Sequence, residues 1–276
     1  MAQRFSGKVV LITGASSGIG AAAARQFAAE GATVALVART TETLQRVAAD
    51  IGARGGAARA FPADVGDPTG CAVLLATVAE ACGGIDILVN NAGANKRGPV
   101  EHSDPAELAH VVQVNLIAPI VLSRLALPYL RKRGRAAIVN VASIAGQIAV
   151  PHEATYSATK SGLRAFTFAL REELADSCIT VSAVSPGPVD TGFIMDEIDA
   201  VPALVFANPM STADEVAALI LECAADGVRE RTIPVVTGYL ARLGNAFPSL
   251  RRALAPFMEK RGAAVKARYR QRAATR

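Results

Sequence analysis

The amino-acid sequence predicts an α/β protein built on a doubly wound parallel sheet of about seven strands, with helices on both faces and a C-terminal helical extension. Short apolar, β-branched runs alternate with longer helical patterns along the chain. These runs are apolar over their whole length, as strands buried on both faces of a sheet require. Polar and glycine-rich stretches follow several runs, at the strand ends where such sheets bind ligands.

The predicted elements alternate from residue 8 to residue 237. The first run, KVVLIT, is too short for a helix and ends at Gly14, and the helix after it is closed by Gly31. On the same grounds we expect strands at 8–13, 33–38, 59–63, 85–90, 136–142, 179–185 and 231–237. Helices are expected at 19–30, 41–51, 68–81, 104–133, 154–176 and 213–226. Because these helices are long enough to span the sheet, right-handed crossovers between parallel strands are the simplest connection.

The charge of the chain is unevenly distributed. The formal net charge of the 276 residues is +5. Residues 251–276 hold nine of the 29 Lys and Arg residues and one of the 24 acidic residues, a net charge of +8. Residues 1–250 therefore carry 20 bases against 23 acids, a net charge of −3. We divide the chain into a ligand-binding body, residues 1–237, and a basic, amphipathic extension, residues 238–276.

Composition excludes several classes of protein. A hydrophobic content of 51% is too high for a disordered chain, and no uninterrupted apolar run reaches the roughly 18–20 residues of a membrane-spanning helix. The N-terminus has no apolar signal core. The four cysteines are far apart, which argues against disulfides or a zinc site and favours a reducing cytoplasm. We expect no metal.

A glycine-rich stretch, TGASSGIG at 13–20, follows the first strand. Glycine lets the backbone turn tightly and approach a ligand, and the helix that follows offers unpaired N–H groups to a pyrophosphate. A glycine-rich turn without a ligand is the alternative, but the position between a buried strand and a helix favours a nucleotide. The expected contacts are Gly14, Ser16, Ser17, Gly18, Ile19 and Gly20.

The end of the second strand indicates which dinucleotide binds. A carboxylate there would accept hydrogen bonds from a free ribose 2′-hydroxyl, but the chain has Arg39 and Thr40. A guanidinium suits a 2′-phosphate, so we expect NADP(H). Asp64 and Val65, after the third strand, are placed to contact the adenine; a turn-capping role for the aspartate is the alternative.

A third group of polar residues lies after the later strands. Asn91, Ala92 and Gly93 follow the fourth strand, Ser143 follows the fifth, and Asn115 lies in the long helix. The residues of a YxxxK pattern, Tyr156 and Lys160, are neighbours on one helix face. A nearby ammonium favours the phenolate and lowers the pKa of a tyrosine toward working pH.

The ordered combination of these motifs resembles the short-chain dehydrogenase/reductase family, whose fold is Rossmann-like, over about residues 5–237. The motifs are TGxxxGxG at 13–20, NNAG at 90–93, Asn115, Ser143, YxxxK at 156–160 and PG at 186–187. The resemblance implies catalytic roles for Asn115, Ser143, Tyr156 and Lys160, with Tyr156 as the acid/base. It also implies that Lys160 holds the nicotinamide ribose. Further cofactor contacts that it implies are Pro186, Gly187, Val189 and Thr191.

The activity that follows is NADP(H)-dependent transfer of hydride between nicotinamide and a carbonyl or secondary alcohol. We expect Asn95, Lys96, Ile144, Gln147, Ile148 and the apolar segment 192–209 to line the substrate pocket. Such a lining predicts an apolar, moderately bulky substrate. An NAD(H)-dependent alcohol dehydrogenase of the same fold and a non-catalytic dinucleotide-sensing protein are the alternatives.

The C-terminal extension has three interpretations. Its apolar residues recur every three or four positions, interrupted by Pro248 and Pro256, and its last dozen residues are expected to fray. The extension packs on the body or on a second subunit and covers the substrate entrance, or it contacts an anionic membrane surface. Nucleic-acid binding is disfavoured because no reading motif is present. We expect a cytoplasmic homodimer or higher homo-oligomer, formed through helices 104–133 and 154–176, and peripheral to the inner face of the membrane if the second interpretation holds.

Overall fold

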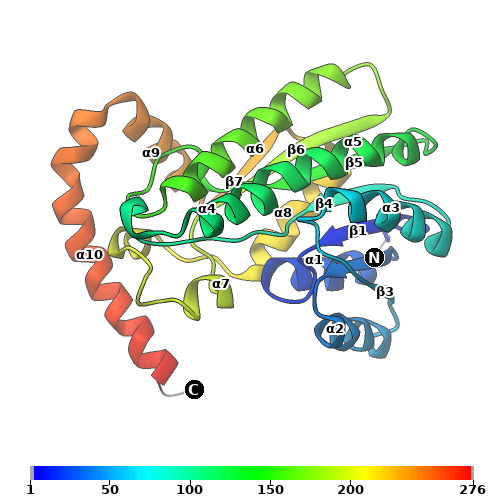
Figure 1. The fold of residues 1–276 in the computed structure, drawn as a ribbon, viewed down its shortest axis with the longest axis horizontal. Coiled ribbons are helices and arrows are strands. Elements are labelled where there is room, and N and C mark those ends of the chain that lie inside the picture. The colour runs from blue at the N-terminus through cyan, green and yellow to red at the C-terminus, as the bar shows by residue number, and fades with distance from the viewer. Residues whose placement is uncertain (1–2, 275–276) are drawn as a thin grey trace.

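The computed structural model describes residues 3–274, without the side chains of residues 240, 242–246, 248, 250–252, 254 and 272–274. Its centre is a seven-stranded parallel sheet in the order β3-β2-β1-β4-β5-β6-β7 (Figure 1). The strands are β1 Val9–Thr13, β2 Thr33–Ala38, β3 Ala57–Pro62, β4 Ile87–Asn90, β5 Ala136–Val141, β6 Ile179–Pro186 and β7 Glu230–Ile233. The strand order reverses between β1 and β4, which creates the crevice where such sheets bind ligands. The predicted fold class is confirmed.

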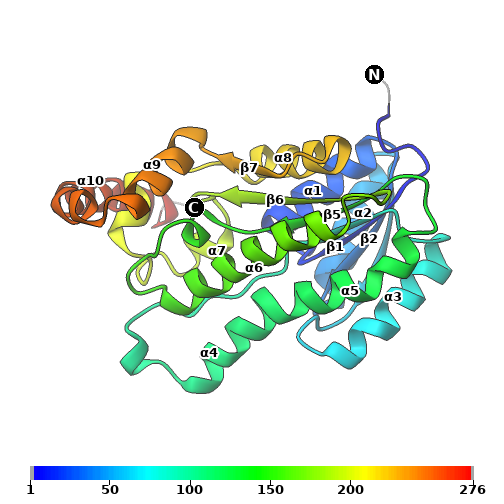
Figure 2. The ribbon, with the colours of Figure 1, turned by 90° about the horizontal axis from the view of Figure 1, so that it is seen from above.

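Helices cover both faces of the sheet, so that it lies between two apolar layers (Figure 2). Ala-rich α1 (Gly18–Ala29), α2 (Thr41–Ala53) and α8 (Ala213–Asp226) pack on one face. The other face is covered by α3 (Pro68–Cys82), α5 (Ala118–Leu130) and α6 (Ala154–Glu173). The helix α3 begins where the sequence predicts, because Asp67 caps its N-terminus: the Asp67 carboxylate accepts from the Thr69 N–H at 3.0 Å.

The predicted helix 104–133 contains a local widening. The helix α4 (Pro105–Val112) passes into a π-helical turn, Gln113–Ile117, and then into α5. Such turns are rare and frequently lie at functional sites. Asn115 occupies this one, which aims its side chain at the loop after β4.

The predicted seventh strand is too long by several residues. It ends at Ile233 because Pro234 has no N–H with which to continue the ladder, and Val235 already begins the helix α9 (Val235–Ala246). After α9 comes α10 (Pro248–Ala274), which runs along one end of the molecule, far from β2 and β3 (Figure 1).

The C-terminal extension differs from the sequence prediction in three ways. Pro256 lies inside α10 and does not break it, and the helix continues to Ala274, so the last dozen residues are mostly helical. Three residues of the expected packing stripe, Tyr239, Phe247 and Phe257, are 63%, 59% and 67% exposed. The side chains of its other members, Leu243, Leu250 and Leu254, lie outside the described part of the chain.

Candidate active site

A cavity of about 880 Å³ lies beyond the carboxyl ends of the strands and reaches from the glycine-rich loop to the C-terminal helix. It brings together nearly all of the residues that the sequence predicted for the site. These are Gly14, Ser16, Ser17, Gly18, Ile19, Arg39, Thr40, Asp64, Val65, Asn91, Ala92, Gly93, Ser143, Tyr156, Lys160, Pro186, Gly187, Val189 and Thr191. The predicted residues Gly20 and Asn115 do not line the cavity and lie behind its wall.

The glycine-rich loop has the shape that its sequence suggests. Gly14 and Gly18 adopt φ values of +66° and +52°, which favour glycine. A Cβ on Gly14 would lie 2.9 Å from the Ala92 Cα, and a Cβ on Gly20 only 2.2 Å from the Gly14 carbonyl oxygen. Gly20 therefore allows the first turn of α1 to pack on the loop, while Gly14 and Gly18 shape the surface that faces the cavity.

The loop after β4 is held against β1 by a residue that the sequence analysis did not single out. The Thr13 hydroxyl accepts from the backbone N–H groups of Asn91 and Ala92, both at 3.0 Å, and donates to the Val89 carbonyl at 3.3 Å. The Asn91 amide donates in return to the Thr13 carbonyl at 2.9 Å. These bonds fix the floor of the cavity where two strand ends meet.

Two charged residues lie at the end of the cavity near β2 and β3. Arg39 is exposed at the end of β2 and Asp64 follows β3, and both line the cavity. The Asp64 carboxylate accepts from the Gly66 N–H at 2.8 Å, so it has the turn-capping contact that the sequence left as an alternative.

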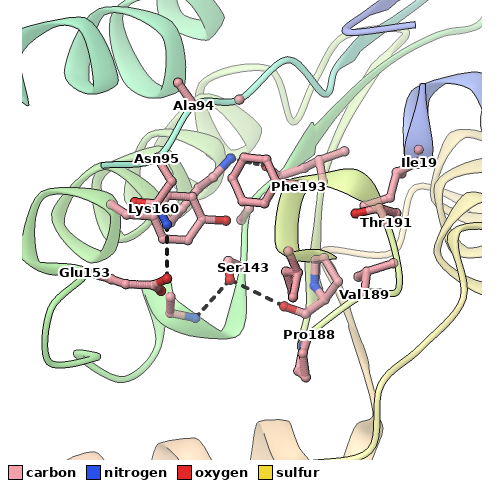
Figure 3. Close-up of a pocket in the computed structure, with 18 of the residues that line it drawn as sticks. Ile19, Ala94, Asn95, Ser143, Glu153, Lys160, Pro188, Val189, Thr191 and Phe193 are labelled. Carbon is pink, nitrogen blue, oxygen red and sulfur yellow. Dashed lines mark hydrogen bonds between the residues drawn. The ribbon is translucent and has the colours of Figure 1, made fainter. Parts of the chain in front are cut away.

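Ser143, Tyr156 and Lys160 lie near one another at the centre of the cavity. Figure 3 shows Ser143 and Lys160 together with Glu153 and Phe193 around one space. The Lys160 ammonium is 5.7 Å from the centre of the Tyr156 ring and donates to the Val141 carbonyl at 2.8 Å. The Ser143 hydroxyl donates to the Pro186 carbonyl at 3.4 Å and accepts from the Ala145 N–H at 3.1 Å.

Burial controls the proton affinities of this group. It raises the pKa of Tyr156 to about 12, helped by the nearby Glu153 carboxylate and opposed by the Ser143 hydrogen bond and by Arg97. Burial also lowers the pKa of Lys160 to about 8. The expected lowering of the tyrosine pKa is therefore wrong for this structure: burial of the phenol is the largest influence on its pKa and raises it.

Asn115 fixes the next part of the chain after β4. Its side-chain oxygen accepts from the Ala94 N–H at 2.8 Å, and its amide donates to the Ala94 carbonyl at 2.8 Å and to the Thr159 hydroxyl at 3.2 Å. The side chain thus ties the widened helix turn to the loop and to α6, one residue before Lys160.

An ion pair beside Tyr156 was missed by the sequence analysis. The Arg97 Nε donates to the Glu153 carboxylate at 3.0 Å, and both side chains are less than a tenth exposed. Asn95 donates to the same carboxylate at 3.1 Å. Arg97 also reaches segment 192–209: it donates to the Phe193 carbonyl at 3.0 Å and forms an ion pair with Glu197.

Of the residues expected around a substrate, some line the cavity and two do not. Asn95, Ile144 and Ile148 line the cavity, as do several residues of segment 192–209, including Phe193, Ile194 and Val205. Two expected residues do not, because each has a charged partner elsewhere. Gln147 donates to the Glu230 carboxylate at 2.9 Å, and Lys96 pairs with Glu107 at 2.7 Å.

Segment 192–209, the lid, is pinned at its base. The strand-like pair Val189 and Ser211 joins its two ends, with the Asp190 N–H donating to the Ser211 carbonyl at 2.9 Å and the Ser211 N–H to the Pro188 carbonyl at 2.9 Å. The segment contains two short helices, α7 (Gly192–Met195) and a 3-10 turn at Ala203–Ala207.

Comparison with known proteins decides the family. Residues 8–201 match the family model described as short chain dehydrogenase. The chain belongs to the short-chain dehydrogenases. It is 39% identical over 214 residues to the ketoacyl reductase HetN of a Nostoc species, covering 77% of this chain and 75% of that protein.

Solved structures of short-chain dehydrogenases share its fold. A short-chain dehydrogenase from Burkholderia cenocepacia, crystallised with NADP, superposes with a TM-score of 0.77 at 35% identity, over 83% of this chain and 97% of that one. A metagenomic short-chain oxidoreductase, also in complex with NADP, gives 0.72 at 33% identity over the same shares. This short-chain dehydrogenase is accordingly an oxidoreductase.

Proposed function

We propose that the protein is an NADP(H)-dependent oxidoreductase that transfers hydride between nicotinamide and a carbonyl or secondary alcohol, with Tyr156 as the acid/base. The observation that carries the proposal is one continuous cavity, which runs from the glycine-rich loop to Ser143, Tyr156 and Lys160. A dinucleotide whose pyrophosphate is held at the glycine-rich loop would have its nicotinamide near Tyr156 and Lys160.

The cavity suits a dinucleotide. Gly14 and Gly18 line the cavity beside the start of α1, where unpaired N–H groups favour a pyrophosphate. Lys160 would hold the nicotinamide ribose, and Gly187, Val189 and Thr191 would contact the nicotinamide. When bound, the cofactor supplies or accepts the hydride.

Arg39 supports NADP(H) over NAD(H). It is the exposed cation at the end of β2 and lines the cavity, where a 2′-phosphate would be neutralised. Two relatives were crystallised with NADP. Arg39→Asp should reverse the ratio of kcat/KM for NADPH and NADH, and an unchanged ratio would identify an NAD(H)-dependent enzyme of the same fold.

In the reductive direction, Tyr156 gives its proton to the carbonyl oxygen as charge develops there. A pKa near 12 keeps the phenol protonated at neutral pH, so the donor is present before substrate binds. The Ser143 hydroxyl is within hydrogen-bonding distance of the phenol and would orient the same oxygen. Asn115 hydrogen-bonds to the loop at Ala94 and to Thr159, the residue before Lys160. Its proposed role is to position a water molecule that relays protons to and from the site.

The substrate that fits best is an apolar, moderately bulky carbonyl compound. Side chains of Ile144, Ile148, Phe193 and Val205 line the cavity near Tyr156. A relative at 39% identity is named a ketoacyl reductase, which supports a carbonyl carried on an acyl chain.

NADPH oxidation across ketones graded by size and polarity tests the proposal. Tyr156→Phe should retain NADPH binding and lose turnover by at least about a hundredfold, the usual contribution of a positioned acid. Tight NADPH binding without oxidation of any carbonyl would identify a dinucleotide-sensing protein instead.

We further propose a homodimer formed through α4, α5 and α6. One described helical stretch, Pro105–Leu130, is long and apolar enough to cross a membrane by length and composition, yet only 44% of its most apolar window is buried in the chain. A partner subunit would cover the rest. Light scattering coupled to size exclusion tests this: a monomer mass would contradict it.

The membrane interpretation of the extension is retained as a separate proposal. Tyr239, Phe247 and Phe257 are exposed on or between α9 and α10, and Lys260 and Arg261 follow on the same helix. Co-sedimentation with anionic vesicles, for the full chain and for a chain ending at Tyr239, tests it. Equal partitioning of the two chains would refute the contact.

A further inference from the structure

One face of α10 forms a wall of the cavity. Ala255, Met258 and Glu259 line the same cavity as Tyr156 and the glycine-rich loop. Their spacing of three and four residues places them on a single face of the helix. The neighbouring Phe257 is not part of the cavity lining, and its side chain is 67% exposed to solvent. The helix α10 therefore contributes to a cavity whose proposed catalytic residues, Tyr156 and Lys160, lie about a hundred residues earlier in the chain.

The same face, farther along the helix, is fastened to the lid. A Cβ on Gly262 would lie 1.9 Å from the Ala203 carbonyl oxygen, so only glycine permits this approach. Val265 and Tyr269 pack against the buried lid residues Val201 and Phe206. These contacts hold the helix in one register against the lid.

Polar contacts fix the register further. The Lys266 ammonium donates to the lid carbonyls of Asp199, at 2.9 Å, and Val201, at 2.6 Å. Arg270 forms an ion pair with the Asp199 carboxylate. Because Lys266 satisfies carbonyl oxygens in the lid stretch between its two short helices, the helix and the lid form one unit.

The lining between Tyr156 and α10 is apolar. It includes Ile148, Val150, Leu204, Val205 and Ala241 from three different segments of the chain. Ser143 and Tyr156 are the polar groups placed to orient a carbonyl, and Glu259 is the charged residue that α10 itself contributes to the lining. A substrate with its carbonyl at Tyr156 would direct an apolar chain toward Met258.

We propose that α10 is the distal wall of the substrate site and that Met258 sets the length of the apolar chain that a substrate can carry. The proposal rests on the proposed function, since the carbonyl end is placed at Tyr156. It adds a specificity-determining residue from outside the stretch, residues 8–201, that matches the family model.

The test is NADPH oxidation with a series of straight-chain 2-alkanones from four to fourteen carbons. For the wild-type protein, kcat/KM should rise about fourfold with each methylene that enters the cavity and then level off. Met258→Trp should move the plateau to shorter chains by about two to four carbons, and Met258→Ala should move it to longer ones. Phe257→Trp, which changes the adjacent residue on the exposed face, is the matched control and should keep the wild-type plateau.

An unmoved plateau in both Met258 variants would overturn the proposal while leaving the proposed function intact. Calorimetric titration of the same ketones into the NADP⁺-loaded protein gives a second readout that needs no turnover. If no ketone is reduced by the wild type, the proposed function fails. The chain-length dependence of binding in Met258→Trp, against Phe257→Trp, then still decides whether α10 limits an apolar ligand.

Discussion

Replacing Lys160 by methionine should stabilise the cofactor-free protein while abolishing its activity. The Lys160 side chain is 4% exposed, and its ammonium has the Val141 carbonyl as an acceptor at 2.8 Å. Methionine has a similar length and fills the same space without a charge. The residue most needed for the proposed chemistry is thus expected to weaken the empty fold.

The magnitude follows from the pKa of Lys160. Burial lowers this pKa from 10.5 to about 8, and each pKa unit corresponds to about 1.4 kcal/mol. The charged lysine therefore costs the folded state about 3 kcal/mol at pH 7. In Lys160→Met the hydrogen bond to the Val141 carbonyl is lost, which lowers the gain in stability by about 1–2 kcal/mol. The net gain is about 2 kcal/mol, or a rise in Tm of about 5 °C.

The stability difference between Lys160→Met and the wild type should also depend on pH. Below pH 8 lysine is charged in both folded and unfolded states, so the full cost is present. Between pH 8 and 10.5 the folded protein holds fewer protons than the unfolded chain, and the stability of the wild type rises with pH. The advantage of Lys160→Met should therefore shrink as the pH increases through this window.

Thermal unfolding followed by circular dichroism at pH 7 and pH 10, without cofactor, measures both effects. Tyr156→Phe, which keeps the lysine, is the control and should show the pH dependence of the wild type. A Lys160→Met protein that melts below the wild type at pH 7, with an unchanged difference at pH 10, would refute the reasoning.

Three further outcomes are expected. Arg97→Met should lower the free energy of unfolding in urea by about 3 kcal/mol because it leaves the Glu153 carboxylate buried without a cation; an Arg97→Met protein as stable as the wild type would contradict this. Gly262→Val should speed tryptic cleavage within α10, since its side chain meets a lid carbonyl, whereas Ala263→Val, on the exposed side, should not; equal rates would contradict the docking. The rate of alcohol oxidation should rise from pH 7 to pH 10, because the phenol of Tyr156, with a pKa near 12, must be deprotonated to act as a base; an oxidation rate that peaks near neutral pH would contradict that pKa.

The central strands β1, β2, β4, β5 and β6 were predictable because each is a mostly apolar, buried run bounded by turn residues, and burial on both faces requires that pattern. The edge strands β3 and β7 carry charged residues and are less buried. Errors arose where a backbone feature decides the outcome. Pro234 ends the last strand early, and the widened turn at Gln113–Ile117 leaves no mark on the spacing of apolar residues. Both are local departures from a periodicity that is otherwise correct.

The site was predictable where a motif follows a strand end, as with Ser143 and the glycine-rich loop. Arg97 and Glu153 were missed because a pair separated by 56 positions has no periodic signal. The docking face of α10 was missed for a different reason. Large apolar residues such as Phe257 define a stripe in the sequence, but Phe257 is exposed. The close contact between α10 and the lid is made at Gly262, which approaches the Ala203 carbonyl because it has no side chain.

The pinned base of the lid has a mechanical consequence. Because both ends of segment 192–209 leave the body at the pair Val189 and Ser211, the lid is a flap with one hinge line. Since α10 is fastened to its far side through Gly262 and Lys266, a flap that swings outward takes the helix along. Access to the cavity then depends on how firmly the C-terminal helix is held, and a substitution near the end of the chain can change product release without touching a reacting group.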